Sequence, residues 1–137
     1  MVFMRFWLLK TEPESYGWAD LLRDGGTEWD GVRNAAAAGH LRAMREGARA
    51  LIYHSGKDKA AVGVARVARE AEKDGEEGNW VSVAVAPERP LTRPVTLAAM
   101  KADARLAGMA MLRQSRLSVS PVSEAEWSAL MELAETM

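Results

Sequence analysis

The sequence contains no cysteine and only two histidines, His40 and His54. The lack of cysteine excludes disulfides, a thiolate nucleophile and cysteine-ligated metals. The histidines show no HxxxH or HxxE spacing, so a dedicated zinc site is not expected. The GxSxG, GxGxxG and P-loop motifs are also missing. We therefore expect no metal, no cofactor and no catalytic residues.

Long apolar runs are missing as well. The segment Met1–Lys10 is rich in Phe, Trp and Leu, but it is too short to span a bilayer. It has neither a basic region before it nor a small-residue cleavage site after it. We expect a buried strand here, in a cytoplasmic protein that makes no contact with a membrane. The high usage of alanine and arginine indicates a bacterial source.

The chain has almost no net charge, −1, but its charges lie in blocks. Residues 33–69 hold eight basic and two acidic residues. Residues 70–88 hold one basic and six acidic residues, and residues 89–116 hold six basic residues and one acidic residue. If the fold brings the two basic blocks together, they form one basic face suited to a polyanion. The alternative is ordinary solvated charge.

The length of 137 residues predicts one domain, spanning 1–137. The hydrophobic patterns predict strands over 5–10, 48–54, 61–70, 80–86 and 117–119, and helices over 16–23, 35–45, 97–101 and from 123 onward. Ser15 and Asn34 are expected to cap the first two helices. Because strands and helices do not alternate regularly, we expect an α+β fold, a bent sheet or barrel of five or six strands with short flanking helices.

The six residues from Trp29 to Asn34 combine an indole, a turn glycine, a guanidinium and an amide. Gly31 suits a left-handed turn, and Arg33 would lie beside the N-terminus of the helix that Asn34 caps. A helix start with a nearby guanidinium is a ready anion site, and an indole offers a stacking face. The alternative is a buried Trp anchor, a tight turn and a solvated Arg. The segment is the strongest candidate for a binding site.

Five separated stretches together resemble the EVE domain, a PUA-like family that includes the thymocyte nuclear proteins and is related in fold to YTH domains. They are 6–13 (FWLLKTEP), 29–34 (WDGVRN), 53–55 (YHS), 62–65 (VGVA) and 112–122 (LRQSRLSVSPV). The resemblance implies a PUA-like bent β-barrel. It also implies a pocket for a modified nucleobase, with 5-methylcytosine or 5-hydroxymethylcytosine in DNA as the favoured ligand.

Candidate ligand-binding residues lie in these stretches. Trp29 and Tyr53 would supply stacking faces, and Asn34 and Ser55 hydrogen bonds. Contacts to phosphate or to the base edge are expected from Lys10, Arg33, Arg113 and Arg116. The remaining candidates are Glu12, Gly31, Val32, His54, Leu112, Leu117 and Ser118. Glu12 either reads an exocyclic amine or pairs with Lys10, and His54 is either structural or part of the pocket.

The resemblance is incomplete after Asn34. Many relatives carry Tyr, Gln, Arg and Asn where this chain has Ala35, Ala36, Ala38 and Gly39, and Gln114-Ser115 replaces a more usual Arg-Gly. Side chains that would reach a ligand are therefore missing. The other tryptophans, Trp7, Trp18, Trp80 and Trp127, are expected in the core.

The function expected from these observations is a non-catalytic reader of nucleic acid, with DNA preferred over RNA as the partner. An RNA-modification binding module is one alternative. An enzyme that uses Glu12, His54 and Ser55 on a nucleotide is another, and a small-molecule sensor that uses the same pocket is a third. Loss of binding at raised salt separates a phosphate-contacting reader from such a sensor.

Overall fold

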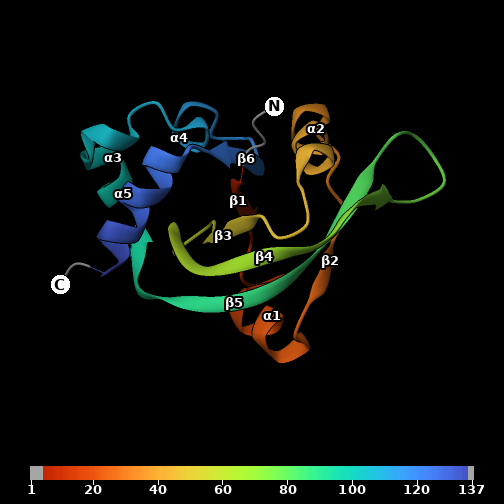
Figure 1. The fold of residues 1–137 in the computed structure, drawn as a ribbon, viewed down its shortest axis with the longest axis horizontal. Helices are drawn as coiled ribbons and strands as arrows, with labels where there is room; N and C mark the ends of the chain where they lie inside the picture. Colours follow the sequence, from red (N-terminus) through yellow and green to blue (C-terminus); the bar gives the residue numbers. More distant parts are fainter. Residues whose placement is uncertain (1–4, 136–137) are drawn as a thin grey trace.

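A computed structural model describes residues 5–135. Its elements follow one another in mixed order (Figure 1). The strands are β1 (Phe6–Thr11), β2 (Thr27–Trp29), β3 (Arg49–His54), β4 (Ala60–Lys73), β5 (Val81–Thr96) and β6 (Val119–Val122). The helices are α1 (Trp18–Asp24), α2 (Ala35–Ala43), α3 (Leu97–Ala102), the 3₁₀ turn η1 (Ala104–Leu106), α4 (Ala110–Arg113) and α5 (Glu124–Glu135).

All six strands form one curved sheet in the order β2-β5-β4-β3-β1-β6. The β1–β3 pair is parallel and the other pairs are antiparallel. The edge strands β2 and β6 do not pair with each other, so the sheet bends around without closing. In Figure 1, α3, α4 and α5 gather at one end, and the tip of the β4–β5 hairpin projects at the other. The expected α+β class and strand number are confirmed.

Strand β5 is longer than expected, because it continues through Pro87, Pro90 and Pro94 instead of ending at Ala86. Beyond Val85 only β4 pairs with β5, since β2 stops there. Proline lacks the N–H that an inner strand must donate, but a strand edge without a neighbour tolerates it. The register between β4 and β5 also shifts near Pro87 and Pro90, and such irregularities accommodate the ring.

All four expected helices are present, with changes at their ends. Gly17, not Ser15, precedes α1, and the Asp20 carboxylate accepts from the Gly17 N–H at 2.7 Å. Asn34 caps α2 as expected, since its Oδ1 accepts from the Ala37 N–H at 2.9 Å. The predicted capping box of α5 is confirmed by two reciprocal bonds between Ser123 and Glu126.

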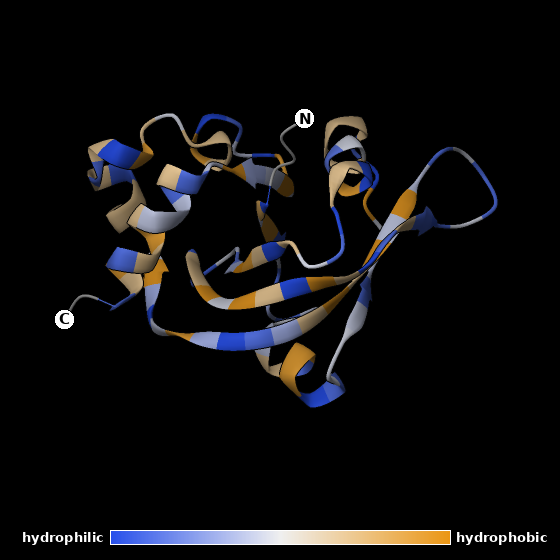
Figure 2. Ribbon diagram, in the orientation of Figure 1, coloured by the Kyte–Doolittle hydropathy of each residue, from blue (hydrophilic) through white to orange (hydrophobic). Residues whose placement is uncertain are grey.

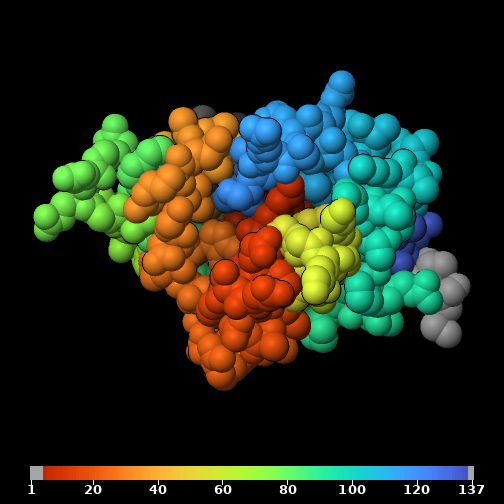
Figure 3. Space-filling model, turned by 180° about the vertical axis from the view of Figure 1, so that it is seen from behind, coloured from red at the N-terminus to blue at the C-terminus, as the bar shows by residue number. Residues whose placement is uncertain are grey.

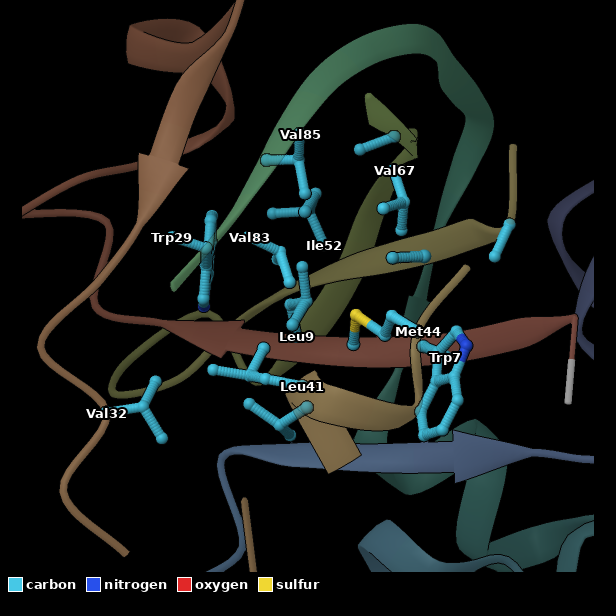
Figure 4. Close-up of a cluster of buried hydrophobic side chains, with 14 of the residues drawn as sticks. Trp7, Leu9, Trp29, Val32, Leu41, Met44, Ile52, Val67, Val83 and Val85 are labelled. Carbon is cyan, nitrogen blue, oxygen red and sulfur yellow. The ribbon is translucent and has the colours of Figure 1, made fainter. Parts of the chain in front are cut away.

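Two hydrophobic cores lie on opposite faces of the sheet. Along β1, Trp7 and Leu9 enter the first core, and Phe6 and Leu8 enter the second, as the two-residue period of a strand requires. The first core packs under α1 and α2 and is drawn in Figure 4. The second packs under α3, α4 and α5. Trp7, Trp18 and Trp127 are core residues as predicted, whereas Trp80 belongs to neither core.

Candidate ligand-binding pocket

A pocket of about 720 Å³ opens where the first core reaches the surface. Its walls come from the end of β1 and the turn after it, from β2 and from the loop that leads to α2. Its lining residues are Lys10, Thr11, Glu12, Ser15, Tyr16, Thr27, Glu28, Trp29, Asp30, Gly31, Val32, Arg33, Asn34 and Ser118. Trp29 and Val32 lie at the same end of the first core (Figure 4), so the pocket continues that core outward. We call it the β1–β2 pocket.

Figure 3 looks at the face that carries this pocket. The atoms of the segments that line it surround a hollow: red ones from the turn after β1, orange ones from the loop before α2 and blue ones near β6. Three segments far apart in the sequence therefore meet around one opening.

The loop from Asp30 to Asn34 is held from outside by one carboxylate. Asp74, at the end of the β4–β5 hairpin, accepts from the Gly31 N–H at 2.9 Å and from the Arg33 guanidinium at 2.9 Å. These two bonds hold the pKa of Asp74 below its ordinary value, and the bond from the Arg33 guanidinium has the larger effect. Gly31 has a φ of +74°, a conformation that glycine adopts without strain. The loop is thus preformed, with Asp74 as its latch.

Two aromatic side chains line the pocket. Trp29 is 8% exposed, so most of its indole packs in the first core and only a small part borders the opening. Tyr16 is half-buried, and its hydroxyl donates to Asp24 at 2.9 Å. Burial, as the largest cause, raises the pKa of this hydroxyl. Tyr16 was not predicted as a site residue, because the sequence pattern places it only at the start of the helix that follows.

Tyr53, expected to supply a stacking face for the ligand, does not line the pocket. It is 3% exposed and lies in the second core, on the opposite face of the sheet. Its neighbour Ile52 is the residue of β3 that points into the first core. Alternation along a strand predicts which residues share a face, but not which of the two faces carries the site.

Some carboxylates of the pocket already accept hydrogen bonds within the protein, and others do not. Both carboxylate oxygens of Glu28 accept from Arg69, at 2.6 and 2.9 Å, and Ser82 adds a third bond. The Arg69 bonds lower the pKa of Glu28. Asp30, in contrast, accepts no hydrogen bond from the described residues, and Glu12 has only a long one, 3.4 Å, from the Ser55 hydroxyl. Glu12 and Asp30 are the carboxylates available to a ligand.

The pocket also offers hydrogen-bond donors. Asn34 uses Oδ1 for the α2 cap, which leaves its amide NH₂ free to donate. The Lys10 ammonium donates to the Ser115 carbonyl at 2.6 Å and keeps two further N–H groups. Burial lowers the pKa of Lys10. Lys10 makes no ion pair with Glu12 in the structure, so that alternative is not observed.

His54 and Ser55 do not line the pocket. The His54 Nε2 accepts from the Trp18 N–H at 3.0 Å, so a neutral ring carries its proton on Nδ1, which lies 3.2 Å from Asp58. The Ser55 hydroxyl lies 3.2 Å from the Thr11 carbonyl oxygen. Of the two readings of His54, the structure favours the structural one, since it holds the start of α1.

The segment that joins α4 to β6 has mixed roles. Leu117 is buried in the first core, Leu112 packs against the second, and Ser118 reaches the β1–β2 pocket. Arg113 and Arg116 are exposed and do not line the pocket. Within residues 5–135 neither has an acidic partner, and Arg116 is two residues before Ser118, which borders the opening.

The basic blocks do not form one continuous basic face. In the first block, Arg33, Arg45, Arg49 and Arg69 pair with acidic residues of the 70–88 block, at 2.9 to 3.6 Å. Opposite charges that are separate in the sequence are therefore adjacent in the fold. Of the cations expected to contact phosphate, Lys10, Arg113 and Arg116 have no acidic partner within residues 5–135, and Lys10 lines the pocket.

Six lining residues were not predicted: Thr11, Ser15, Tyr16, Thr27, Glu28 and Asp30. Thr11 and Asp30 are adjacent to predicted site residues, and Thr27 and Glu28 lie in β2, whose three residues are too few for a pattern to reveal. Ser15 and Tyr16 lie in the turn between β1 and α1. Ala35, Ala36, Ala38 and Gly39 do not line the pocket, and Ala38 is buried. Among residues 5–135 there is no cluster of potential metal ligands and no helix long and apolar enough to cross a membrane.

One curved, open sheet of six strands flanked by short helices, with a pocket beside the end of β1 and β2, defines an α+β domain of the PUA-like class. The family model of the EVE domain matches residues 5–133. The chain belongs to the EVE domain family.

Relatives of known name and structure are similar over nearly the whole chain. Chicken (Gallus gallus) thymocyte nuclear protein 1 is 32% identical over 165 residues, covering 94% of this chain and 68% of that protein. A solution structure from Rhodopseudomonas palustris has a TM-score of 0.90 at 43% identity and covers 95% and 92% of the two chains. Human THYN1 in complex with DNA containing 5-methylcytosine has a TM-score of 0.90 at 28% identity, covering 96% and 98%.

Proposed function

We propose that this EVE domain is a non-catalytic reader that binds a modified cytosine, such as 5-methylcytosine or 5-hydroxymethylcytosine, in DNA. The β1–β2 pocket carries the proposal: its volume of about 720 Å³ lies within the usual range for small-ligand sites, roughly 300–1,000 Å³. Support comes from the likeness to the human relative, which was solved with DNA containing 5-methylcytosine.

The arrangement of polar groups suits a cytosine-type edge. A base must leave its stack before its Watson–Crick edge can enter a pocket. Carboxylates accept from the exocyclic amine of cytosine, and Glu12 and Asp30 are the unoccupied carboxylates. The free amide of Asn34 can donate to the ring nitrogen or carbonyl. Tyr16 and the exposed part of Trp29 offer the apolar surface for the ring.

Flanking phosphates would meet the unpaired cations beside the opening. Lys10 lines the pocket, and Arg113 and Arg116 belong to the segment that ends at Ser118. Such contacts release counterions and make binding fall steeply with salt.

The test is a titration with single- and double-stranded oligonucleotides that carry one central cytosine, 5-methylcytosine, 5-hydroxymethylcytosine or thymine, at two salt concentrations. Thymine keeps the methyl group of 5-methylcytosine but replaces its amine by a carbonyl. We expect selective, salt-sensitive binding of a modified cytosine and weak binding of thymine. Equal or absent binding to all strands overturns the proposal, and an RNA series is then the next ligand.

The matched variant for this titration is Asn34→Asp. Aspartate caps helices as well as asparagine does, so α2 and the fold are retained. The substitution removes the amide donor and adds a negative charge, so we expect affinity for the modified strand to fall at least tenfold. Unchanged affinity would remove Asn34 from the site. The proposal that the protein is not an enzyme is tested by long incubation with the oligonucleotide, after which the base should be recovered unaltered.

A further inference from the structure

Trp80 is the one aromatic residue of the described chain that neither enters nor packs against a hydrophobic core. Its alternation with the valines of β5 predicts a core residue, and that prediction is wrong. Trp80 directly precedes β5, in the stem of the β4–β5 hairpin, which projects from one end of the molecule (Figure 1). A large, half-buried indole outside the core requires another explanation.

The indole is held in a defined place. Its backbone carbonyl accepts from the Asp74 N–H at 2.8 Å, and the Arg33 guanidinium lies 5.6 Å from the ring centroid. A side chain at Gly78 would begin 3.0 Å from the Trp80 Nε1, so the glycine lets the chain pass close to the ring. A ring fixed in this way loses little freedom on binding.

Trp80 is connected to the β1–β2 pocket through Arg33. Arg33 lines that pocket and also a neighbouring hollow of about 680 Å³, which Trp80 and the hairpin tip complete. Trp80 also lines a hollow of about 550 Å³ beside Arg42 and Lys73. Figure 3 shows the green hairpin beside the orange segment that bears the pocket loop, on the same face of the molecule.

The charges distinguish the two hollows. In the Arg42 hollow, the Arg42 guanidinium donates to the Asn79 carbonyl, and neither Arg42 nor Lys73 has an acidic partner within residues 5–135. Glu72 lies there too, but it pairs with Arg69 at 3.3 Å. The hollow at the hairpin tip instead carries Glu76 and Glu77, which have no basic partner within residues 5–135 and repel a phosphate.

We propose that Trp80, Arg42 and Lys73 form a second nucleotide subsite, which stacks a base next to the modified one and holds its phosphate. The inference rests on the proposed function of the β1–β2 pocket. An aromatic face with adjacent cations is the combination that binds single-stranded nucleotides. Arg33, in contact with both sites, sets their spacing.

The experiment compares wild type, Trp80→Ala and Trp80→Phe on two ligands: the nucleoside 5-methyl-2′-deoxycytidine and a single-stranded 12-mer with one central 5-methylcytosine. We expect Trp80→Ala to weaken 12-mer binding by roughly tenfold to a hundredfold and Trp80→Phe to restore most of it. Nucleoside affinity should be the same in all three proteins. Thermal unfolding of each variant verifies folding, which the position outside both cores favours.

Charge variants provide the second readout. Arg42→Gln should lower the salt slope of 12-mer binding by about 1, and Glu77→Gln, at the tip, should not lower it. The subsite is overturned if folded Trp80→Ala binds the 12-mer as wild type does, or if nucleoside affinity falls as much as 12-mer affinity. Failure of wild type to bind any modified strand overturns the proposed function itself.

Discussion

The two cores of this domain share one sheet but end differently. The second core is enclosed by α3, α4 and α5, and side chains such as Leu130 and Met100 are fully buried in it. The first core ends at Trp29 and Val32, which also line the β1–β2 pocket. The second core therefore contributes only to stability, whereas the first core contributes to stability and also forms part of the pocket wall. Substitutions on the two faces should separate unfolding from binding.

The largest effect is expected from Leu130→Ala in the second core. Leu130 is fully buried, so the truncation leaves a cavity and should lower the free energy of unfolding by about 2–5 kcal/mol. Denaturant unfolding measures this loss. The affinity of the remaining folded molecules for a modified strand should be that of wild type. A change in that affinity would show that the faces are not independent.

Overpacking the first core should have the next largest effect. A Cβ at Gly63 would lie 2.6 Å from three ring atoms of Trp18, so Gly63→Ala must displace a buried indole. We expect a loss of about 1–3 kcal/mol of unfolding free energy.

Gly39→Ala is the matched control for Gly63→Ala. Gly39 lies in α2 with open space around the position of its Cβ, so the added methyl should stabilise the helix by roughly 0.5–1 kcal/mol. Equal effects of the two substitutions on thermal unfolding would contradict this packing of Trp18.

The latch of the pocket loop should affect binding more than folding. Asp74→Asn removes the charge that holds Arg33 and Gly31, so the loop must be ordered when ligand binds. We expect affinity to fall roughly threefold to tenfold, with little change in thermal unfolding. Asp103→Asn is the control, because Asp103 makes the same kind of bonds to Arg105 far along the chain from the loop.

The latch also gives a pH dependence. Asp74 has a lowered pKa in the folded protein, so its contribution to the stability of the folded state is complete above the unfolded carboxyl pKa of about 3.9. It is lost as the pH falls through the lower, folded value. Chemical-shift titration of the Gly31 amide should therefore show no change near neutrality and a transition below about pH 3.9. A transition near neutral pH would assign the shift to another group.

The smallest effect is expected at the exposed cations. Arg116→Gln should reduce the slope of log affinity against log salt by about 1 and leave unfolding unchanged. Arg93→Gln is the control, since Arg93 is also exposed but lies on β5, outside the segment that leads to Ser118 at the pocket. Equal slopes for both variants would exclude Arg116 from phosphate contact.

The sequence predicts much of this arrangement. The Asn34 cap, the Ser123 capping box and the β3–β4 hairpin follow from local rules that involve neighbouring residues. Tyr53 and Trp80 were misplaced because the face that a strand buries depends on helices distant in the sequence. The latch between Asp74 and Arg33 joins residues 41 positions apart, and no local pattern reports such a contact.

The free edge of β5 has a consequence for the behaviour of the protein at high concentration. An unpaired strand edge normally offers a row of N–H and C=O groups on which another chain can build. Here Pro87, Pro90 and Pro94 interrupt that row, since none of them carries an N–H. The free edge of β5, the longest strand of the sheet, is therefore a poor template for the addition of a strand from another molecule.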